Sequence, residues 1–312
     1  MRHISVLSLA LLLGAPLIAK DAMPTETELG VDAPIEAIIE GAPAKLQITT
    51  DLVDRLTLTT NFVAANGIKP APIAGNADIN FWGRKEVKGK NRPLDYAIAG
   101  RKEKGRAFWF MDVPQPKFDG SVGPWAIPFD RIVMRLSSDI GTEKLFEFPY
   151  FGDLNNGSFS AHKEDSFTTA VAFGVERELK FPLASAATGA AIAMVYGGTL
   201  SGEPWQQPIA FGISRPVRLM TLERPFVVGP FSFTQIAVRT RSTRDAAGSG
   251  EAIAEAVDED NLDPQEIVVE ALGKKAKKPI FSFAIGRSSL NQCASITFDK
   301  AVRKISLSCR PD

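Results

Sequence analysis

The feature that most constrains this chain is an internal repeat, because duplicated halves determine an architecture before any single residue does. In the first half, the segment Asp119 to Gly123 is followed four positions later by an isoleucine and then by the strand-like run 130–136. In the second half, Phe283 to Gly286 is followed four positions later by a leucine and then by the run 295–299. The repeat predicts two related units in one chain.

A second pair of segments extends the repeat upstream. Lys45 to Leu52 in the first half is aligned with Lys180 to Ala187 in the second. The spacing to the downstream pair is longer in the second half, and the polar segment 243–278 accounts for the extra length. Because this segment is acidic in its first part and basic in its last, we expect a surface insertion.

Short β-rich runs separated by Gly and Pro residues make up most of the sequence, whereas patterns typical of long amphipathic helices are scarce. The runs cover residues 34–40, 45–50, 55–60, 131–136, 226–228, 231–238 and 305–308. A chain of 312 residues with 45% hydrophobic content can bury two cores. We predict an all-β protein with a few short helices, built from a first lobe over 30–150 and a second over 160–312.

Charge and motifs exclude several classes of function. The net charge is zero with interleaved signs, which argues against nucleic-acid partners. Neither a dinucleotide-binding nor a P-loop glycine motif is present, and the acidic run 258–263 lacks the glycine and distal glutamate of an EF-hand, so no cofactor or metal is expected. After removal of a leader, His162 is the only histidine. We interpret it as a solvated loop residue rather than a member of a catalytic triad or zinc site.

Residues 1–19 have the pattern of a cleavable signal peptide. Basic residues at Arg2 and His3 precede the apolar run 4–13, and a segment with small residues at 15–19 follows as the expected cleavage region. No later segment approaches the length of apolar sequence that spans a bilayer, so the mature protein is expected without a transmembrane segment. The pattern predicts a periplasmic or secreted protein.

Two cysteines, Cys293 and Cys309, flank two strand-like runs joined by a polar turn. Mirror pairing about Ala301 would place Ser295 opposite Leu307 and the two cysteines opposite each other. In an oxidising compartment a cross-strand disulfide is then possible, worth roughly 3 kcal/mol in the chain-entropy model. The alternative is a pair of free thiols.

With these elements in order, the sequence resembles the bilobal pepsin-like and retropepsin-like aspartic proteases. Lobes of that family have a strand pair, an apolar strand ending in Asp-Thr-Gly-Ala, and an apolar-apolar-Gly element that leads to a closing strand. The similar segments are 35–41, 46–48, 122–123 and 130–136 in the first lobe, and 181–183, 285–286, 290, 296–299 and 304–307 in the second. The resemblance implies two pseudo-symmetric β-barrel lobes facing each other.

The resemblance fails at the catalytic tetrapeptide. Its first-lobe position reads Thr49-Thr50-Asp51-Leu52, and its second-lobe position reads Ala184-Ser185-Ala186-Ala187 or, in another frame, Ala187-Thr188-Gly189-Ala190. Threonine, serine and alanine cannot replace two carboxylates that share a proton. The hydroxyls of Thr50 and Ser185 stand where the family uses a threonine to hydrogen-bond across the lobes; the alternative is two strand-end hydroxyls in polar turns.

Two further features leave function open. Asp51 or Asp54 could approach the cleft in a shifted register, although no acidic residue occurs from 181 to 202 to complete a pair. Residues 81–110 combine aromatic and basic side chains where the family places a flap, which could grip an acidic or aromatic peptide; the alternative is an ordinary solvated hairpin with core aromatics.

Three functional hypotheses follow from these features. The leading one is an exported, catalytically silent protein that binds an extended peptide or an envelope protein in the inter-lobe groove, or has a structural role. The alternatives are an atypical peptidase with relocated carboxylates and an unrelated β-sandwich interaction module.

Overall fold

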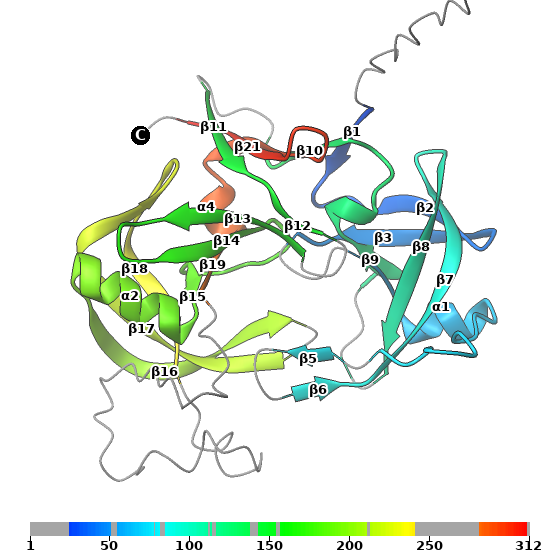
Figure 1. Ribbon diagram of the computed structural model, residues 1–312, viewed down its shortest axis with the longest axis horizontal. Helices are drawn as coiled ribbons and strands as arrows, with labels where there is room; N and C mark the ends of the chain where they lie inside the picture. The colour runs from blue at the N-terminus through cyan, green and yellow to red at the C-terminus, as the bar shows by residue number, and fades with distance from the viewer. Residues whose placement is uncertain are drawn as a thin grey trace, which may run out of the picture.

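The computed structural model confirms the all-β class, with short helices between the strands (Figure 1). It describes residues 25–50, 55–77, 79–81, 85–111, 113, 117–137, 143–153, 157–210, 213–240 and 281–310. The predicted signal peptide, the polar insertion 243–278, and Asp51 and Asp54 lie outside the described residues.

Strands of the first half close into a barrel and not into a sandwich. In barrel order they are β2 (Ile35–Ile39), β3 (Ala42–Ile48), β9 (Gly120–Val122), β4 (Leu56–Leu58), β8 (Arg101–Phe110) and β7 (Gly89–Ile98). Strand β2 shows why they face inward: Ile35, Ala37 and Ile39 are buried and alternate with exposed Glu36 and Ile38. This period of two places one side of each strand in the barrel core.

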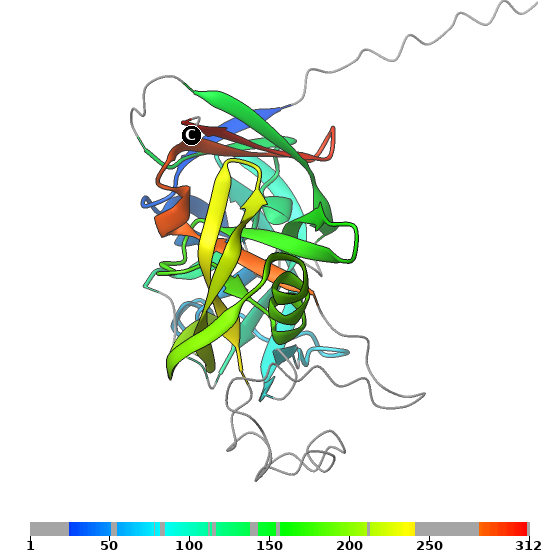
Figure 2. The same cartoon turned by 90° about the vertical axis from the view of Figure 1, so that its left-hand side faces the viewer.

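Strands of the second half form an eight-stranded sheet. In sheet order they are β12 (Phe151–Asp153), β13 (Gly157–Lys163), β14 (Thr168–Gly174), β19 (Ser282–Gly286), β15 (Leu183–Ala184), β18 (Phe231–Arg239), β17 (Ile213–Val228) and β16 (Thr199–Ala210). Helix α2 (Ala186–Tyr196) packs against β17 and β18, as the side view shows (Figure 2). The resemblance implied a barrel in each half, but in the described residues only the first-half sheet closes.

The repeat reappears in the strand pairing. Strand β3 pairs in parallel with β9, which pairs antiparallel with β4, and the trio β14, β19 and β15 has the same pattern. The third strand of each trio leads into a helix, α1 (Thr60–Ala65) or α2, whose N-cap side chain is Thr59 or Ser185. The predicted equivalence of the Val-Gly and Ile-Gly elements at the ends of β9 and β19 is therefore confirmed.

The upstream half of the sequence alignment is wrong. Residues from Lys45 to Ile48 belong to β3, whose partner in the repeat is β14, whereas Phe181 to Leu183 leads into β15, the partner of β4. Both segments are short apolar runs with a lysine in front, and composition alone could not tell which strand of the trio each one was.

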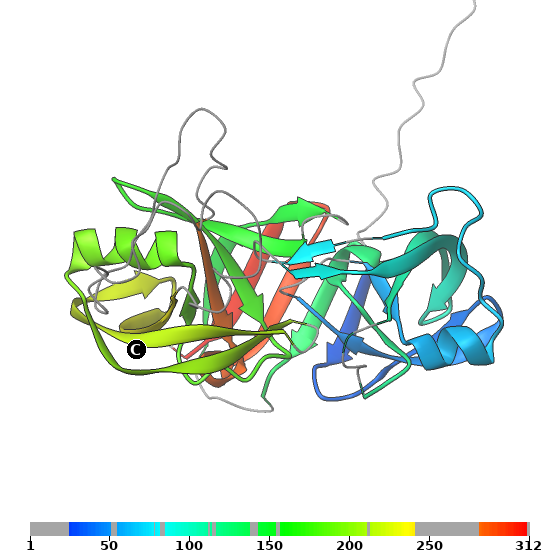
Figure 3. The same ribbon diagram turned by 90° about the horizontal axis from the view of Figure 1, so that it is seen from below.

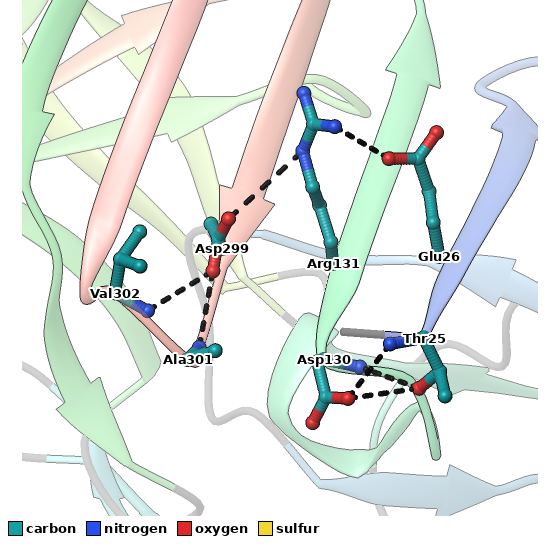
Figure 4. A network of polar contacts seen from close by, with 7 residues as sticks. All are labelled: Thr25, Glu26, Asp130, Arg131, Asp299, Ala301 and Val302. Atoms are coloured by element: carbon teal, nitrogen blue, oxygen red, sulfur yellow. Dashed lines mark hydrogen bonds and ion pairs between the residues drawn. The ribbon is translucent and has the colours of Figure 1, made fainter. Parts of the chain in front are cut away.

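A third sheet draws its strands from both halves. It is built, in order, from β1 (Glu26–Gly30), β10 (Arg131–Arg135), β20 (Cys293–Asp299), β21 (Lys304–Cys309) and β11 (Lys144–Pro149). Arg131 lies between two carboxylates, with its Nη1 2.5 Å from Glu26 Oε2 and its Nε 3.9 Å from Asp299 Oδ2 (Figure 4). Backbone pairing and this charge arrangement together connect the N-terminal strand, the first half and the second half.

The C-terminal hairpin contains the predicted disulfide. Cys293 pairs with Cys309, and their sulfur atoms are 1.98 Å apart. Asp299 Oδ1 accepts hydrogen bonds from the amides of Ala301 and Val302 at 3.1 Å, which closes the turn (Figure 4). The predicted pairing of Ser295 with Leu307 is off by one: Ser295 pairs with Ser308, and an irregularity between Cys293 and Ser295 restores the cysteine register.

Two hydrophobic clusters span the halves. The large core cluster contains residues of the barrel, the mixed sheet and the second half. A smaller one, here called the bridging cluster, joins first-half side chains to second-half ones; its buried members are Ala77, Val87, Phe108, Phe110, Leu179, Leu183, Ile209, Val217 and Ala237. The hairpin of β5 (Ile79–Phe81) and β6 (Lys85–Val87) also lies between the halves (Figures 1 and 3).

Candidate functional site at the junction of the two halves

The junction begins where β3 ends. The amide of Thr49 donates to the carbonyl of Val122 at 3.0 Å, which continues the β3–β9 pairing by one residue. Both Thr49 and Thr50 are buried, and Thr50 has no exposed surface. The chain therefore carries two threonine hydroxyls directly into the contact with the second half.

Thr50 makes hydrogen bonds across the junction, as the sequence predicts. Its Oγ1 accepts from the amide of Val175 at 3.1 Å and donates to the carbonyl of Phe173. Both partners are buried, at 1% exposure each. The Val175 amide also donates to the Phe173 carbonyl at 3.1 Å, so the Thr50 hydroxyl adds a second partner to each of two buried backbone groups.

Glu176 contributes a carboxylate to the same place. Its Oε1 accepts from the Thr49 hydroxyl at 2.6 Å and from the Thr50 amide at 3.0 Å, and its Oε2 lies 3.1 Å from Thr50 Oγ1. The single Thr50 proton is thus shared between this oxygen and the Phe173 carbonyl. A half-buried carboxylate with neutral donors around it is a well-satisfied acceptor, but no second carboxylate is among these partners.

Strand register defines which residues of the two halves are equivalent. Ile48 pairs with Val122 in the first half, as Phe173 pairs with Ile285 in the second. Thr49 is therefore equivalent to Gly174, Thr50 to Val175, and Asp51 to Glu176 in the sequence.

The predicted second-half positions, Ala184 and Ser185, are wrong as counterparts of Thr49 and Thr50. Ala184 is in β15, between β18 and β19. Ser185 caps α2, with its Oγ accepting from the amides of Thr188 at 3.2 Å and Ser282 at 3.3 Å. These are contacts within the second half, so the Ser185 hydroxyl stabilises a helix end rather than the junction.

Sequence reasoning missed Glu176 because it looked for an acid between residues 181 and 202. A usable signal was present, since the β-rich run from Thr168 to Phe173 ends in Gly174-Val175-Glu176 just as Lys45 to Ile48 ends in Thr49-Thr50-Asp51. Both segments place an acid three residues after the last apolar strand residue.

His162 is not the solvated loop residue that we expected. It lies on β13, its ring is 20% exposed, and its Nε2 is 2.6 Å from Glu164 Oε1. The hydroxyl of Tyr196 donates to the same oxygen at 2.7 Å. Burial alone would raise the pKa of Glu164, but the hydrogen bonds from Tyr196 and His162 outweigh it and lower that pKa. Burial and the bond to Glu164 raise the pKa of Tyr196 to about 12.

The segment expected to form a flap has two different parts. Strands β7 and β8 belong to the barrel, and Trp109 and Phe110 are core residues at 4% and 3% exposure. Only the β5–β6 hairpin lies between the halves. Trp82 and Arg84, which the flap interpretation used, lie outside the described residues.

Among the described residues, no group of three or more His, Cys, Asp or Glu side chains is placed to hold a metal ion. In the same part of the chain, no helix is long and apolar enough to cross a bilayer.

Comparisons with known proteins show similarity at the level of solved structures. No protein-family model matches the chain, and no curated protein matches it. Among solved structures, the chain is similar to the EIAV protease complexed with the inhibitor HBY-793, at 18% identity and a TM-score of 0.22, over 29% of this chain and 79% of that chain.

Proposed function

We propose that this protein is an exported, catalytically silent protein of aspartic-protease-like architecture, with a binding or structural role in the envelope. One observation carries the proposal: Thr49 and Gly174, which the resemblance aligns with the two catalytic aspartates, stand at paired positions of the junction. Beside them, Thr50 Oγ1 accepts a cross-half hydrogen bond from the Val175 amide. The scaffold contact is kept, whereas neither paired position holds an acid.

The chemistry explains why these residues argue against peptide hydrolysis. An aspartic protease needs two carboxylates that share one proton, one to activate water and one to polarise the scissile carbonyl. A threonine hydroxyl does not titrate near neutral pH, and glycine has no side chain. Glu176 alone cannot play both roles, and its oxygens already accept hydrogen bonds from Thr49 and Thr50.

For the ligand, we propose an extended peptide or an envelope protein bound between the halves. The position of the β5–β6 hairpin between the halves supports this, because a hairpin there could cover an extended chain and pair with its backbone. Export is supported by the signal-like residues 1–19 and by the Cys293–Cys309 disulfide, a bond that persists in oxidising compartments. Cell fractionation tests it: a full-length chain with reduced cysteines in the cytosol would contradict export.

A second candidate function is an atypical peptidase that uses Asp51 and Glu176. The observation in its favour is that Glu176 reaches across the junction to Thr49 and Thr50, and Asp51 is its counterpart in the sequence repeat. Asp51 and Glu176, which lie two residues after Thr49 and Gly174, would then share the proton. The two candidates make opposite predictions for a single assay.

The assay measures cleavage of a mixed peptide library by the purified mature protein at acidic pH, with and without pepstatin. We compare the wild type with Glu176→Gln, Asp51→Asn and the matched control Glu178→Gln, whose exposed carboxylate accepts from Ser288 outside the junction. The silent-scaffold proposal predicts no cleavage by any of the four proteins. Cleavage that both junction substitutions abolish and the control retains would establish the peptidase instead.

A further inference from the structure

A cavity of about 470 Å³ opens on the first half, away from the Thr49–Glu176 junction. It lies over β8 and the short helix η1 (Pro124–Ala126), with the turn between β20 and β21 at its edge. Its volume is in the range of pockets that hold small molecules or a few peptide residues. Neither the junction chemistry nor the bridging cluster uses this cavity.

The charge of the cavity is strongly one-sided. Four cationic side chains line it, Arg55, Lys104, Arg106 and Lys300, and Glu103 is the one acid among its described lining residues. The whole chain has a net charge of zero, so this excess is local. Cations that converge on a concave surface raise the local concentration of anions and hold them with charge-assisted hydrogen bonds.

The cationic groups are held in place by the fold. Lys300 Nζ donates to the carbonyl of Ile127 at 2.6 Å, and the Arg55 guanidinium lies 4.3 Å from the centre of the Phe108 ring. Arg106 donates from Nη1 to the side-chain oxygen of Asn91. The fourth cation, Lys104, is exposed and lies 3.6 Å from Asp95 Oδ1. Because the other three are fixed before any ligand arrives, binding costs less side-chain entropy than it would on a mobile lysine surface.

An aromatic wall complements the charge. Trp125 lines the cavity, and its ring centre is 5.1 Å from that of Tyr150. The guanidinium of Arg303 lies 4.5 Å from the centre of the Trp125 ring. Its buried Nε1 has no hydrogen-bond partner within the described part of the chain. Aromatic rings and a further cation therefore lie together at this wall of the cavity.

We propose that this cavity is a binding site for a small ligand that carries carboxylate or phosphate groups. Carboxylate and phosphate are both anions that arginine can bind through two hydrogen bonds and that lysine attracts by its charge. The lining of the cavity therefore suits either group. An acidic peptide segment would supply the carboxylates, and a phosphorylated small molecule would supply the phosphates. The site is independent of the function proposed for the junction.

Isothermal titration calorimetry tests the site with two probes, a capped tri-glutamate peptide and tripolyphosphate, and with capped tri-glutamine as the neutral reference. The variant Lys104→Gln/Arg106→Gln removes two exposed cavity cations, and Lys45→Gln is the control, because it removes an exposed cation of the same half outside the cavity. Circular dichroism melts verify that every variant is folded.

We expect the wild type to bind at least one anionic probe more tightly than tri-glutamine, and the double variant to lose about tenfold or more in affinity. Lys45→Gln should remain within about twofold of the wild type, because loss of one remote exposed charge is screened by salt. The probe that binds more tightly identifies the source of the anion. No binding of either probe, or an equal loss in Lys45→Gln, would overturn the proposal.

Discussion

The hydroxyl of Thr50 gives the sharpest test of how the two halves are joined. Thr50→Val keeps the shape and the β-branched backbone preference of threonine but removes the one side-chain atom that bonds to the second half. The amide of Val175 and the carbonyl of Phe173 lose the hydroxyl as a partner and keep the 3.1 Å hydrogen bond between them. Glu176 Oε2 also loses its contact with the hydroxyl. Both groups remain buried in the variant, because the valine methyl fills the space of the hydroxyl.

The size of the effect follows from the hydrogen bonds that the hydroxyl makes. A typical hydrogen bond contributes about 0.5–1.5 kcal/mol net to stability. Because the Val175 amide keeps the Phe173 carbonyl as its acceptor, we expect Thr50→Val to lower the free energy of unfolding by about 1–3 kcal/mol. Thr50→Ser retains the hydroxyl and loses one methyl group, which costs about 1 kcal/mol.

Urea denaturation followed by tryptophan fluorescence measures the difference, with the slope checked for constancy among variants. The matched control is Thr297→Val on β20, a buried threonine at 7% exposure that has no hydroxyl contact to the junction. If Thr50→Val destabilises the protein no more than Thr297→Val does, or if Thr50→Ser is equally damaging, the cross-half hydrogen bond does not have the role assigned to it.

Three other perturbations have defined outcomes. Replacing Cys293 and Cys309 by alanine opens a loop with a sequence separation of 16 and should lower the free energy of unfolding by about 3 kcal/mol relative to the oxidised wild type. Folding lowers the pKa of Glu164 below 4.5, so its stabilising contribution to the folded state is present above that pH and is lost as the pH falls through the folded-state pKa. In acid unfolding experiments, the stability of Glu164→Gln should therefore depend less on pH below about pH 5 than that of the wild type. Gly229→Ala would place a methyl 2.3 Å from Phe148 Cζ at φ +57°, and thermal melts should show a loss of at least about 2 kcal/mol.

Several parts of the fold were predictable because they depend on local pattern. Alternation of apolar and polar residues predicted the all-β class, and strand β2 illustrates it with buried Ile35 and Ile39 around exposed Glu36. The cysteine pairing followed from the length of the two runs around the turn at Asp299. These features require only neighbouring residues or the two strands of one hairpin.

The candidate site was predictable in its first half alone. Thr49 and Thr50 follow a short apolar strand that the sequence identified, and Thr50 crosses the junction as expected. The second half was misplaced because Ala184-Ser185 and Gly174-Val175 both follow β-rich runs, and a slip between them changes every assignment. Only long-range pairing of β14 with β19 tells them apart.

The amino-acid order by itself therefore determined the strand content, the duplication and the absence of a His-based or nucleotide-binding motif. Only the tertiary structure decided that Glu176 meets Thr49, that Ser185 caps a helix, and that His162 packs beside Glu164 in a half-buried strand. The physical reason is that contacts between distant strands depend on the register of whole sheets, which is stabilised by many weak pairings across the chain and is not encoded in any one short motif.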